Sequence, residues 1–235
     1  MTLKDNVSVI LLAGGKGTRI KSTSPKQYLL LKNKLMARHS FEVFLSTPNI
    51  KEIIVVCEPA YQHYFATDSH VPILFALPGE RRQDSVFNGL EKVSADTEWV
   101  CIHDSARPLI NSEIVNRVID AACEVGAATT GMPLKFTVKE SNAQCLVKKT
   151  LDRSLIWEIQ TPQVIKIDLL KRGFNCANKN NLTVTDDVSL VELLGLPVKL
   201  VEGSDCNIKV TTSQDLVIAE HFMEKFSPDA EHAKL

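Results

Sequence analysis

Glycines and cations stand close together directly after the first apolar run of the chain. Gly14, Gly15 and Gly17 follow that run, and the cations Arg19 and Lys26 come next. Glycine lets backbone N–H groups approach an anion closely, and neighbouring cations add positive charge. The segment therefore predicts a binding site for a phosphate group.

The spacing within this loop excludes two common nucleotide-binding motifs. A dinucleotide fingerprint requires a third glycine where this chain has Ile20. A Walker A loop requires its lysine after the last glycine, whereas Lys16 here lies between glycines. A glycine-rich turn without a ligand is the remaining alternative. The cations that follow the loop argue against it.

A carboxylate, Asp104, stands at the end of another apolar run, directly after His103. Ligands of open α/β sheets bind at the carboxyl ends of strands, and Mg²⁺ usually takes one or two protein carboxylates together with phosphates and water. Asp104 is therefore a candidate for holding a divalent cation on a nucleotide phosphate. A structural ion pair between Asp104 and Arg107 is the alternative, with equal weight. His103 fits a buried structural histidine better than a catalytic base.

Three other polar segments are candidates for ligand contacts. Residues 79–85 precede a predicted helix, and their polar groups could recognise a base, although Asp84 or Ser85 could merely cap that helix. Lys209 is a lone cation in an apolar run, so it either extends to solvent or faces a buried anion. Residues 185–187 fit a cap of the following helix better than a ligand contact.

Short apolar runs alternate with segments of helical periodicity, which predicts a mostly parallel α/β sheet with helices on both faces. Several runs are too continuously apolar for a half-exposed sheet. The predicted strands are residues 7–12, 53–57, 73–76, 99–103 and 127–132, with later ones near 198–201 and 208–210. The predicted helices include residues 41–45, 85–93, 113–125, 169–176, 187–194 and 214–223. The fold class is therefore α/β, of the doubly wound kind.

The alternating pattern breaks at residues 134–150. Segments 135–140 and 146–150 are β-type and flank a polar turn, which predicts a hairpin. A polar two-stranded ribbon is marginal by itself. We therefore expect a protruding arm that rests on a second subunit. The chain has no internal repeat or linker, so we expect one domain over residues 1–226 and a flexible tail over 227–235.

Composition narrows the possible partners. Lys and Arg total 27 against 28 for Asp and Glu, which gives a net charge of −1 and no general attraction to nucleic acid or membrane. The first apolar run is far shorter than the ~20 residues that span a bilayer, and no targeting segment is visible. The six cysteines show no CxxC pair and no zinc-ligand spacing, so we expect free, mostly buried thiols in a reducing compartment.

The order of these motifs resembles that of the 2-C-methyl-D-erythritol 4-phosphate cytidylyltransferase family. The similarity extends from about Val7 to Glu220 and is greatest to plant and chlamydial members. It rests on residues 13–19, 25–28, 82–86, 103–108, 151–153, 157, 160–163, 185–187 and 208–211. The resemblance implies a Rossmann-like domain whose β-arm embraces the partner of a homodimer. It also implies transfer of CMP from CTP to methylerythritol phosphate with Mg²⁺, in the non-mevalonate route to isoprenoids.

The resemblance assigns roles to particular residues. The implied catalytic residues are Arg19, Lys26, Lys209 and Arg153. The implied CTP site comprises Ala13, Gly14, Gly15, Gly17, Gly79, Ser85, Ser105 and Lys209. The implied acceptor site comprises Arg107, Thr137, Arg153, Thr161 and Thr185, of which Thr137 and Arg153 come from the partner's arm. Asp104 matches the metal carboxylate.

Two other functions compete with this interpretation. A ribitol 5-phosphate cytidylyltransferase would share the CTP site, and Asp152, Arg153 and Trp157 favour the methylerythritol enzyme over it. A non-catalytic nucleotide-binding module would not need the full set of cations together with the carboxylate. The lack of a visible targeting segment suits the cytoplasm of a bacterium, or a plastid stroma once a leader has been removed.

Overall fold

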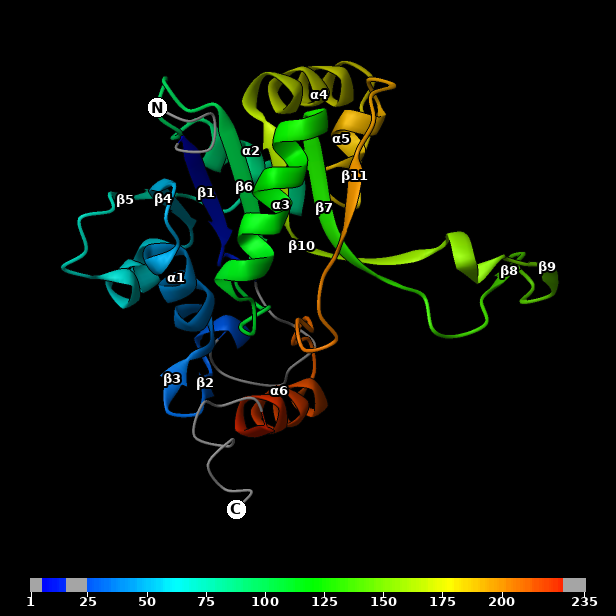
Figure 1. Cartoon of the computed structure of the whole chain (residues 1–235), viewed down its shortest axis with the longest axis horizontal. Helices are drawn as coiled ribbons and strands as arrows, with labels where there is room; N and C mark the ends of the chain where they lie inside the picture. Colours follow the sequence, from blue (N-terminus) through cyan, green and yellow to red (C-terminus); the bar gives the residue numbers. More distant parts are fainter. Residues whose placement is uncertain (1–5, 16–24, 226–235) are drawn as a thin grey trace.

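A seven-stranded sheet forms the centre of the computed structural model, which describes residues 6–15 and 25–225 (Figure 1). The strand order is β11 (Lys199–Glu202), β7 (Ala127–Pro133), β10 (Trp157–Lys166), β6 (Trp99–Asp104), β1 (Val7–Leu12), β4 (Ile50–Val56) and β5 (Ile73–Ala76). Neighbouring strands run parallel except β10, which is antiparallel to both β6 and β7. The predicted mostly parallel α/β sheet is thus confirmed.

Helices cover both faces of this sheet. One face carries α1 (Met36–Ser46) and α3 (Ser112–Val125), and the other carries α2 (Arg82–Leu90), α4 (Ile167–Lys179) and α5 (Ser189–Glu192). Within β1, Val9 and Leu11 belong to the apolar cluster of the first face and Ile10 to that of the second. Successive side chains of a strand face opposite sides. Both faces of β1 are therefore buried, as expected for a parallel strand.

Helix α3 begins and ends at residues that favour helix termini. The Ile114 N–H donates to the Asn111 side chain (2.9 Å), and Gly126 follows the last turn with φ 101°. Asparagine is among the best N-caps, and glycine adopts the left-handed conformation without strain. These local signals explain why the predicted helix 113–125 agrees closely with the observed one.

Short elements gather at the end of the sheet where β1, β4 and β6 terminate. They are the 3-10 turns Lys26–Tyr28 and Pro59–Phe65, the small hairpin of β2 (Leu30–Leu31) and β3 (Lys34–Leu35), and the helix α6 (Ser213–Lys225). Leu31, Met36, Val210 and Ala219 form a third apolar cluster, and Figure 1 shows α6 beside this hairpin. The C-terminal part of the chain therefore returns to the end of the sheet at which β1 leads into the glycine loop.

Strand β10 is absent from the strands predicted above. It contains Pro162 and several buried polar side chains, so its sequence lacks the apolar alternation of a strand. Its pairing with β7 jumps from Ile159 to Gln163, which marks a bulge. Proline lacks the N–H that a ladder of strand hydrogen bonds needs. Within sheets it is therefore found at positions such as bulges, where no such donor is required. The bulge thus explains both the missed strand and the polar residues within it.

Two predictions near the C-terminus differ from the structure. Residues 208–210 form no strand; the Val210 N–H donates to Ala106 O (2.8 Å) instead of joining a ladder. The predicted helix 187–194 is reduced to the single turn α5. Both segments instead make tertiary contacts with residues far away in sequence, Asp187 with Arg82 and Lys209 with Asp104.

The predicted hairpin is present as β8 (Lys139–Ser141) and β9 (Val147–Thr150), followed by the 3-10 turn Arg153–Leu155. Figure 1 shows this arm projecting well away from the central sheet. Phe136 and Leu155 are 76% and 77% exposed there. Contact between the arm and a second subunit stays a prediction.

Other expectations can be compared with the described residues. All six cysteines are free; Cys57 and Cys101 are buried and Cys145 is exposed, so burial is less general than expected. Among residues 6–15 and 25–225, no helix combines the length and apolarity needed to cross a membrane. The predicted tail 227–235 lies outside the described residues, and the single-domain organisation stays a prediction.

A buried polar cluster lies near the other end of β1. Ser8 Oγ donates to Glu52 Oε1 (2.6 Å), and the Ser94 N–H donates to the same oxygen (2.8 Å). Glu52 is only 3% exposed. Burial opposes its charge, but the donors from Ser8 and Ser94 hold the pKa of Glu52 below its usual range.

Replacing Ser8 by alanine should lower the free energy of unfolding at pH 7 by about 1–2 kcal/mol, because an ionised buried acceptor loses a donor. A depressed carboxyl pKa stabilises the fold above the unfolded-state pKa of about 4.3, and this contribution disappears as the pH falls through the folded-state value. The deficit of the variant should therefore shrink toward acid pH. Urea unfolding at pH 7 and near pH 4 measures both effects, and a pH-independent deficit would contradict the role of Glu52.

Candidate active site

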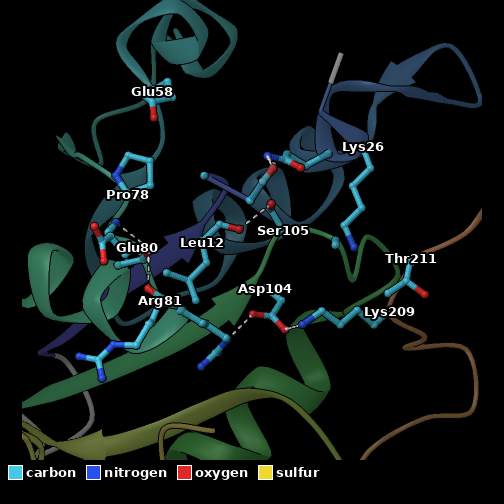
Figure 2. A pocket seen from close by; sticks show the side chains of 17 residues that line it. Leu12, Lys26, Glu58, Pro78, Glu80, Arg81, Asp104, Ser105, Lys209 and Thr211 are labelled. Atoms are coloured by element: carbon cyan, nitrogen blue, oxygen red, sulfur yellow. Dashed lines mark hydrogen bonds and ion pairs between the residues drawn. The ribbon is translucent and has the colours of Figure 1, made fainter. Parts of the chain in front are cut away.

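A cleft of about 610 Å³ opens at the carboxyl ends of β1 and β6 (Figure 2). Ligands of open α/β sheets bind at this end of the sheet. The predicted site residues that line the cleft are Gly14, Gly15, Lys26, Gly79, Ser85, Asp104, Ser105 and Lys209. Residues from five separate stretches of the chain thus meet in one cavity.

The glycine loop lies against Pro78, and the contact leaves no room for a side chain on Gly14. A Cβ on Gly14 would lie 2.5 Å from Pro78 Cβ and 2.7 Å from Pro78 Cγ, whereas a Cβ on Gly15 meets no described atom within 4 Å. Ala13 is 1% exposed and belongs to the core cluster beneath the loop. Ala13, a predicted CTP contact, is therefore not among the residues that line the cleft.

Gly14→Ala should lower the free energy of unfolding by about 1–3 kcal/mol, because the added methyl group forces the loop or Pro78 to move. Gly15→Ala is the matched control, with an expected effect within about 0.5 kcal/mol. Denaturant unfolding of both variants measures the difference. Equal stability of the two variants would show that the loop accommodates the methyl group on residue 14 without loss of stability.

Four charged side chains form a continuous chain of ion pairs, and three of them, Lys209, Asp104 and Arg82, line the cleft. Lys209 Nζ donates to Asp104 Oδ2 (2.6 Å), and Arg82 Nε donates to Asp104 Oδ1 (3.1 Å). Arg82 also forms two parallel bonds to Asp187, both 2.8 Å. Lys209 therefore faces a buried anion, which is one of the two predicted alternatives. Asp104 pairs with Arg82 and Lys209, and its predicted structural ion pair with Arg107 is not among its bonds.

Asp104 keeps its negative charge although it is buried. Burial favours the neutral acid, but Arg82 and Lys209 hold the pKa of Asp104 well below its usual range. Burial likewise opposes the charge of Arg82, and Asp187 and Asp104 raise its pKa. The cleft therefore presents a fixed pattern of charges at neutral pH.

Thr161 and His103 support the backbone of Asp104. The Asp104 N–H donates to Thr161 Oγ1 (3.1 Å), which lies 3.0 Å from His103 Nδ1, and His103 Nε2 lies 3.1 Å from Arg107 O. Both ring nitrogens are thus engaged, and burial lowers the pKa of His103 to about 4. His103 is a neutral structural residue, in agreement with the sequence. Thr161 lines neither pocket described here and holds Asp104 in place.

Lys26 extends from its 3-10 turn toward the segment that carries the second lysine (Figure 2). Lys26 Nζ donates to Val210 O (2.7 Å), and the Val210 N–H donates to Ala106 O (2.8 Å). Ser105 donates to Leu12 O through both its hydroxyl (2.7 Å) and its N–H (3.1 Å). These bonds fix the ends of β1 and β6 to both lysine-bearing segments.

The loop before α2 is fixed by the first turn of that helix. The Gly79 N–H donates to Ser85 Oγ (2.9 Å), and the Arg81 N–H donates to Asp84 Oδ2 (3.0 Å). Asp84 therefore caps the helix, as the sequence allowed. Ser85 instead supports the backbone of the loop that lines the cleft.

A second pocket of about 250 Å³ adjoins the cleft, and Lys209 lines both cavities. Arg107, Glu158 and Asp205 also line this pocket. Arg107 Nη1 donates to Asn207 O at 2.7 Å. The guanidinium is thus held at the pocket wall by backbone, while Asp205 pairs with Lys135 (2.5 Å).

Several predicted site residues are not brought into the cleft. Thr185 is exposed and lines neither pocket, and Thr137 and Arg153 are exposed residues of the arm region. Arg153 Nη1 donates to Lys135 O within the arm (2.8 Å). Gly17 and Arg19 lie outside the described residues.

Arg82 and Gln27 line the cleft and Asp187 binds Arg82, but none of the three is among the individually predicted site residues. Arg82 lies in the first turn of α2, where the helix dipole disfavours a cation. A cation at that position indicates a partner carboxylate. This signal was present in the sequence. Asp187 was expected to cap a helix. Nothing local in the sequence indicates that Arg82, more than one hundred positions away, binds it.

Comparison with known proteins agrees with this geometry. The family model of 2-C-methyl-D-erythritol 4-phosphate cytidylyltransferase matches residues 7–225. The chain is 49% identical to the chloroplastic enzyme of that name from Oryza sativa (94% of this chain, 75% of that protein) and 43% identical to the Chlamydia pneumoniae enzyme (91% and 97%). The structure of 4-diphosphocytidyl-2C-methyl-D-erythritol synthase from Anaerococcus prevotii superposes with a TM-score of 0.84 at 26% identity (94% and 99% coverage). The chain belongs to the 2-C-methyl-D-erythritol 4-phosphate cytidylyltransferase family.

Proposed function

We propose that the 610 Å³ cleft binds CTP and that the adjoining pocket binds 2-C-methyl-D-erythritol 4-phosphate, to which the enzyme transfers CMP. The observation that carries this assignment is the position of Lys209, which lines both cavities and bonds to Asp104. A cation at the junction lies where the two phosphate groups must meet. The products are 4-diphosphocytidyl-2-C-methyl-D-erythritol and pyrophosphate.

The reaction is an in-line displacement at the α-phosphorus of CTP. An acceptor phosphate oxygen forms the new P–O bond, the bond to the bridging oxygen of the β-phosphate breaks, and pyrophosphate leaves. Phosphate monoesters have a second pKa near 6, so the attacking oxygen is already ionised at pH 7. No general base is required, and the neutral, fully bonded His103 does not serve as one. Positioning and charge stabilisation supply the catalysis.

The cations divide this work. Lys209 neutralises the two approaching phosphates, and Lys26, with Arg19 outside the described residues, binds the triphosphate and stabilises the charge on pyrophosphate. The glycine loop and the loop at Gly79 form the nucleotide-binding walls, because both present backbone to the cleft. The proposed CTP contacts are Ala13, Gly14, Gly15, Gly17, Gly79, Ser85 and Ser105.

Asp104 fits a Mg²⁺ ion that is bound mainly by nucleotide phosphates. Each of its oxygens accepts one bond from a cation, and each carboxylate oxygen can accept two. Among the described residues, no three His, Cys, Asp or Glu side chains gather to bind a metal on their own. Bound Mg²⁺ would neutralise charge on the phosphates, and Asp104 would hold it at the end of β6.

The acceptor pocket combines groups suited to a polyol phosphate. Arg107 and Lys209 attract the anion, while Glu158 and Asp205 can accept hydrogen bonds from hydroxyl groups. Thr161 acts through the backbone of Asp104. Thr185, predicted in the same site, lines neither pocket.

The arm supports a homodimer in which each protomer completes the other's acceptor site. Thr137 and Arg153 belong to the arm region and line neither pocket of their own protomer. Exposed apolar side chains, such as Phe136 and Leu155, provide a surface for the partner to bury. A stable, fully active monomer in light scattering would refute this arrangement.

Pyrophosphate release from CTP tests the proposed function. The expected result is turnover with methylerythritol 4-phosphate and little with ribitol 5-phosphate, in the presence of Mg²⁺. Preference for ribitol 5-phosphate would reassign the acceptor. Binding of CTP without turnover on either acceptor would indicate a nucleotide-binding module.

Small molecules and a second copy of the chain are the partners that we propose. The net charge of −1 offers no general attraction to nucleic acid or membrane. The matched relatives include a chloroplastic and a bacterial protein. These names support a plastid stroma or a bacterial cytoplasm as the compartment.

A further inference from the structure

Gln27 connects the glycine loop to the turn that carries Lys26. Its side-chain Nε2 donates to Ala13 O (2.7 Å) and to Gly15 O (2.8 Å), and the residue is 3% exposed. A side-chain amide carries two N–H donors. Both are used on a single loop, although none of the roles assigned above involves Gln27.

Tyr28 adds a third bond to the same loop. Its hydroxyl donates to Ala13 O (2.8 Å), so this carbonyl receives donors from both Gln27 and Tyr28. The Tyr28 ring stacks on Tyr61 with centroids 4.1 Å apart, and it is 6% exposed. Burial raises the pKa of Tyr28 above its ordinary value, so the hydroxyl keeps its proton.

These bonds determine where the Gly14 amide points. A trans peptide is planar, so the C=O of Ala13 and the N–H of Gly14 point in opposite directions. Because Ala13 O is turned toward Gln27, the Gly14 N–H is turned away from Gln27. Gly14 lines the cleft, and no carbonyl or side chain within residues 6–15 and 25–225 accepts from its N–H. An amide in this state is a donor for a phosphate oxygen.

We propose that Gln27 is a positioning residue for CTP, which holds the loop so that the Gly14 N–H meets a phosphate, with Tyr28 as a second support. The proposal rests on the assignment of the cleft to CTP. Gln27 also follows Lys26 directly in the 3-10 turn, so the amide donor and the lysine keep a fixed relative position. Misplacing a positioned group by roughly 1 Å can lower the rate of a reaction by about 10²-fold.

Gln27→Met tests the proposal because it preserves the side-chain volume and removes both donors. The dissociation constant of CTP, measured by calorimetry with Mg²⁺ and without acceptor, should rise about tenfold. The KM of methylerythritol phosphate should stay within about twofold, since its pocket does not include this loop. A residue with only a general structural role would not separate the two substrates.

Tyr28→Phe provides a second variant that keeps the stacked ring. We expect a smaller rise in the CTP dissociation constant, about threefold, because Gln27 still donates to Ala13 O. The double variant should lose more than the product of the single effects, because Ala13 O then has neither donor. Ser8→Ala is the matched control: it removes a buried bond at the other end of β1 and should leave CTP binding unchanged.

Each outcome separates the proposal from its alternatives. CTP binding within about twofold of wild type in Gln27→Met overturns it, and if that variant does not fold, unchanged binding in Tyr28→Phe does so. An equal loss of CTP affinity in Ser8→Ala also overturns it, because the effect would then reflect stability. Absence of CTP binding by the wild-type chain refutes the assignment of the cleft together with the proposal, whereas normal wild-type binding with unaffected variants refutes the proposal alone.

Discussion

Lys209→Met is expected to lower kcat by about 10²–10³-fold, which is the loss seen when one preorganised donor to a developing negative charge is removed. Lys209 is the cation shared by the nucleotide cleft and the acceptor pocket. Its bond to Asp104 holds the ammonium group in place before the substrates bind. The cost should therefore fall on the chemical step, and steady-state measurement of pyrophosphate release with both substrates saturating gives kcat directly.

Lys199→Met is the matched control for this prediction. Lys199 is half exposed, and it pairs with Glu124 at the edge strand β11, outside both cavities. Its loss should leave kcat within about twofold, as expected for a surface ion pair. Turnover near the wild-type rate in Lys209→Met would remove this lysine from the mechanism.

Arg82→Met is expected to lower the free energy of unfolding by about 3–5 kcal/mol, because removing one partner of a buried ion pair leaves an uncompensated charge. Arg82 binds two carboxylates at once, and the Asp187 side chain is only 2% exposed. Urea unfolding at pH 7 measures the change. Adding Asp187→Asn to this variant should restore part of the stability, since the unpaired charge is then gone.

Arg81→Met is the control for Arg82. Arg81 also bonds to a carboxylate, that of Asp84, but half of its side chain is exposed. Its replacement should change the free energy of unfolding far less than that of Arg82, as expected for a surface ion pair. Equal losses in the two variants would contradict a special role for the buried pair.

The pH dependence of Arg82→Met supplies a further check. Burial raises the pKa of Asp187, against the effect of Arg82, and removal of Arg82 should raise it further. A carboxyl with a higher pKa in the folded state binds protons preferentially there, so stability falls as pH rises from about 3.9 through the folded value. The deficit of the variant should therefore be smallest in acid and largest near neutral pH.

Local patterns in the sequence predicted much of this fold. The apolar runs of β1 and β6 and the capped helix α3 are encoded by burial and by terminal residues close in sequence. Parts of the candidate site could also be predicted, where the residue types themselves indicate the chemistry. Gly14, Lys26, Asp104 and Lys209 were all predicted, and the structure places them around one cleft.

Long-range contacts explain what was missed. Strand β10 has too little apolar character to be recognised, because its bulge places polar side chains such as Gln160 and Thr161 in the interior. Those groups are satisfied by residues far away in sequence, for example Asn207 on Gln160. Gln27 resembles any polar residue after a lysine until the fold brings the glycine loop within its reach.

The sequence by itself determined the α/β class, the family and the identity of the main charged groups, because these depend on residue types and on short-range order. Only the tertiary structure decided how the charges are shared: Asp104 with Arg82 and Lys209, and Arg82 with Asp187. It also decided that the Gln27 side chain reaches two carbonyl groups of the glycine loop. Ion pairs and hydrogen bonds depend on distances of a few ångströms between segments far apart in the chain, and those distances exist only after the sheet has assembled.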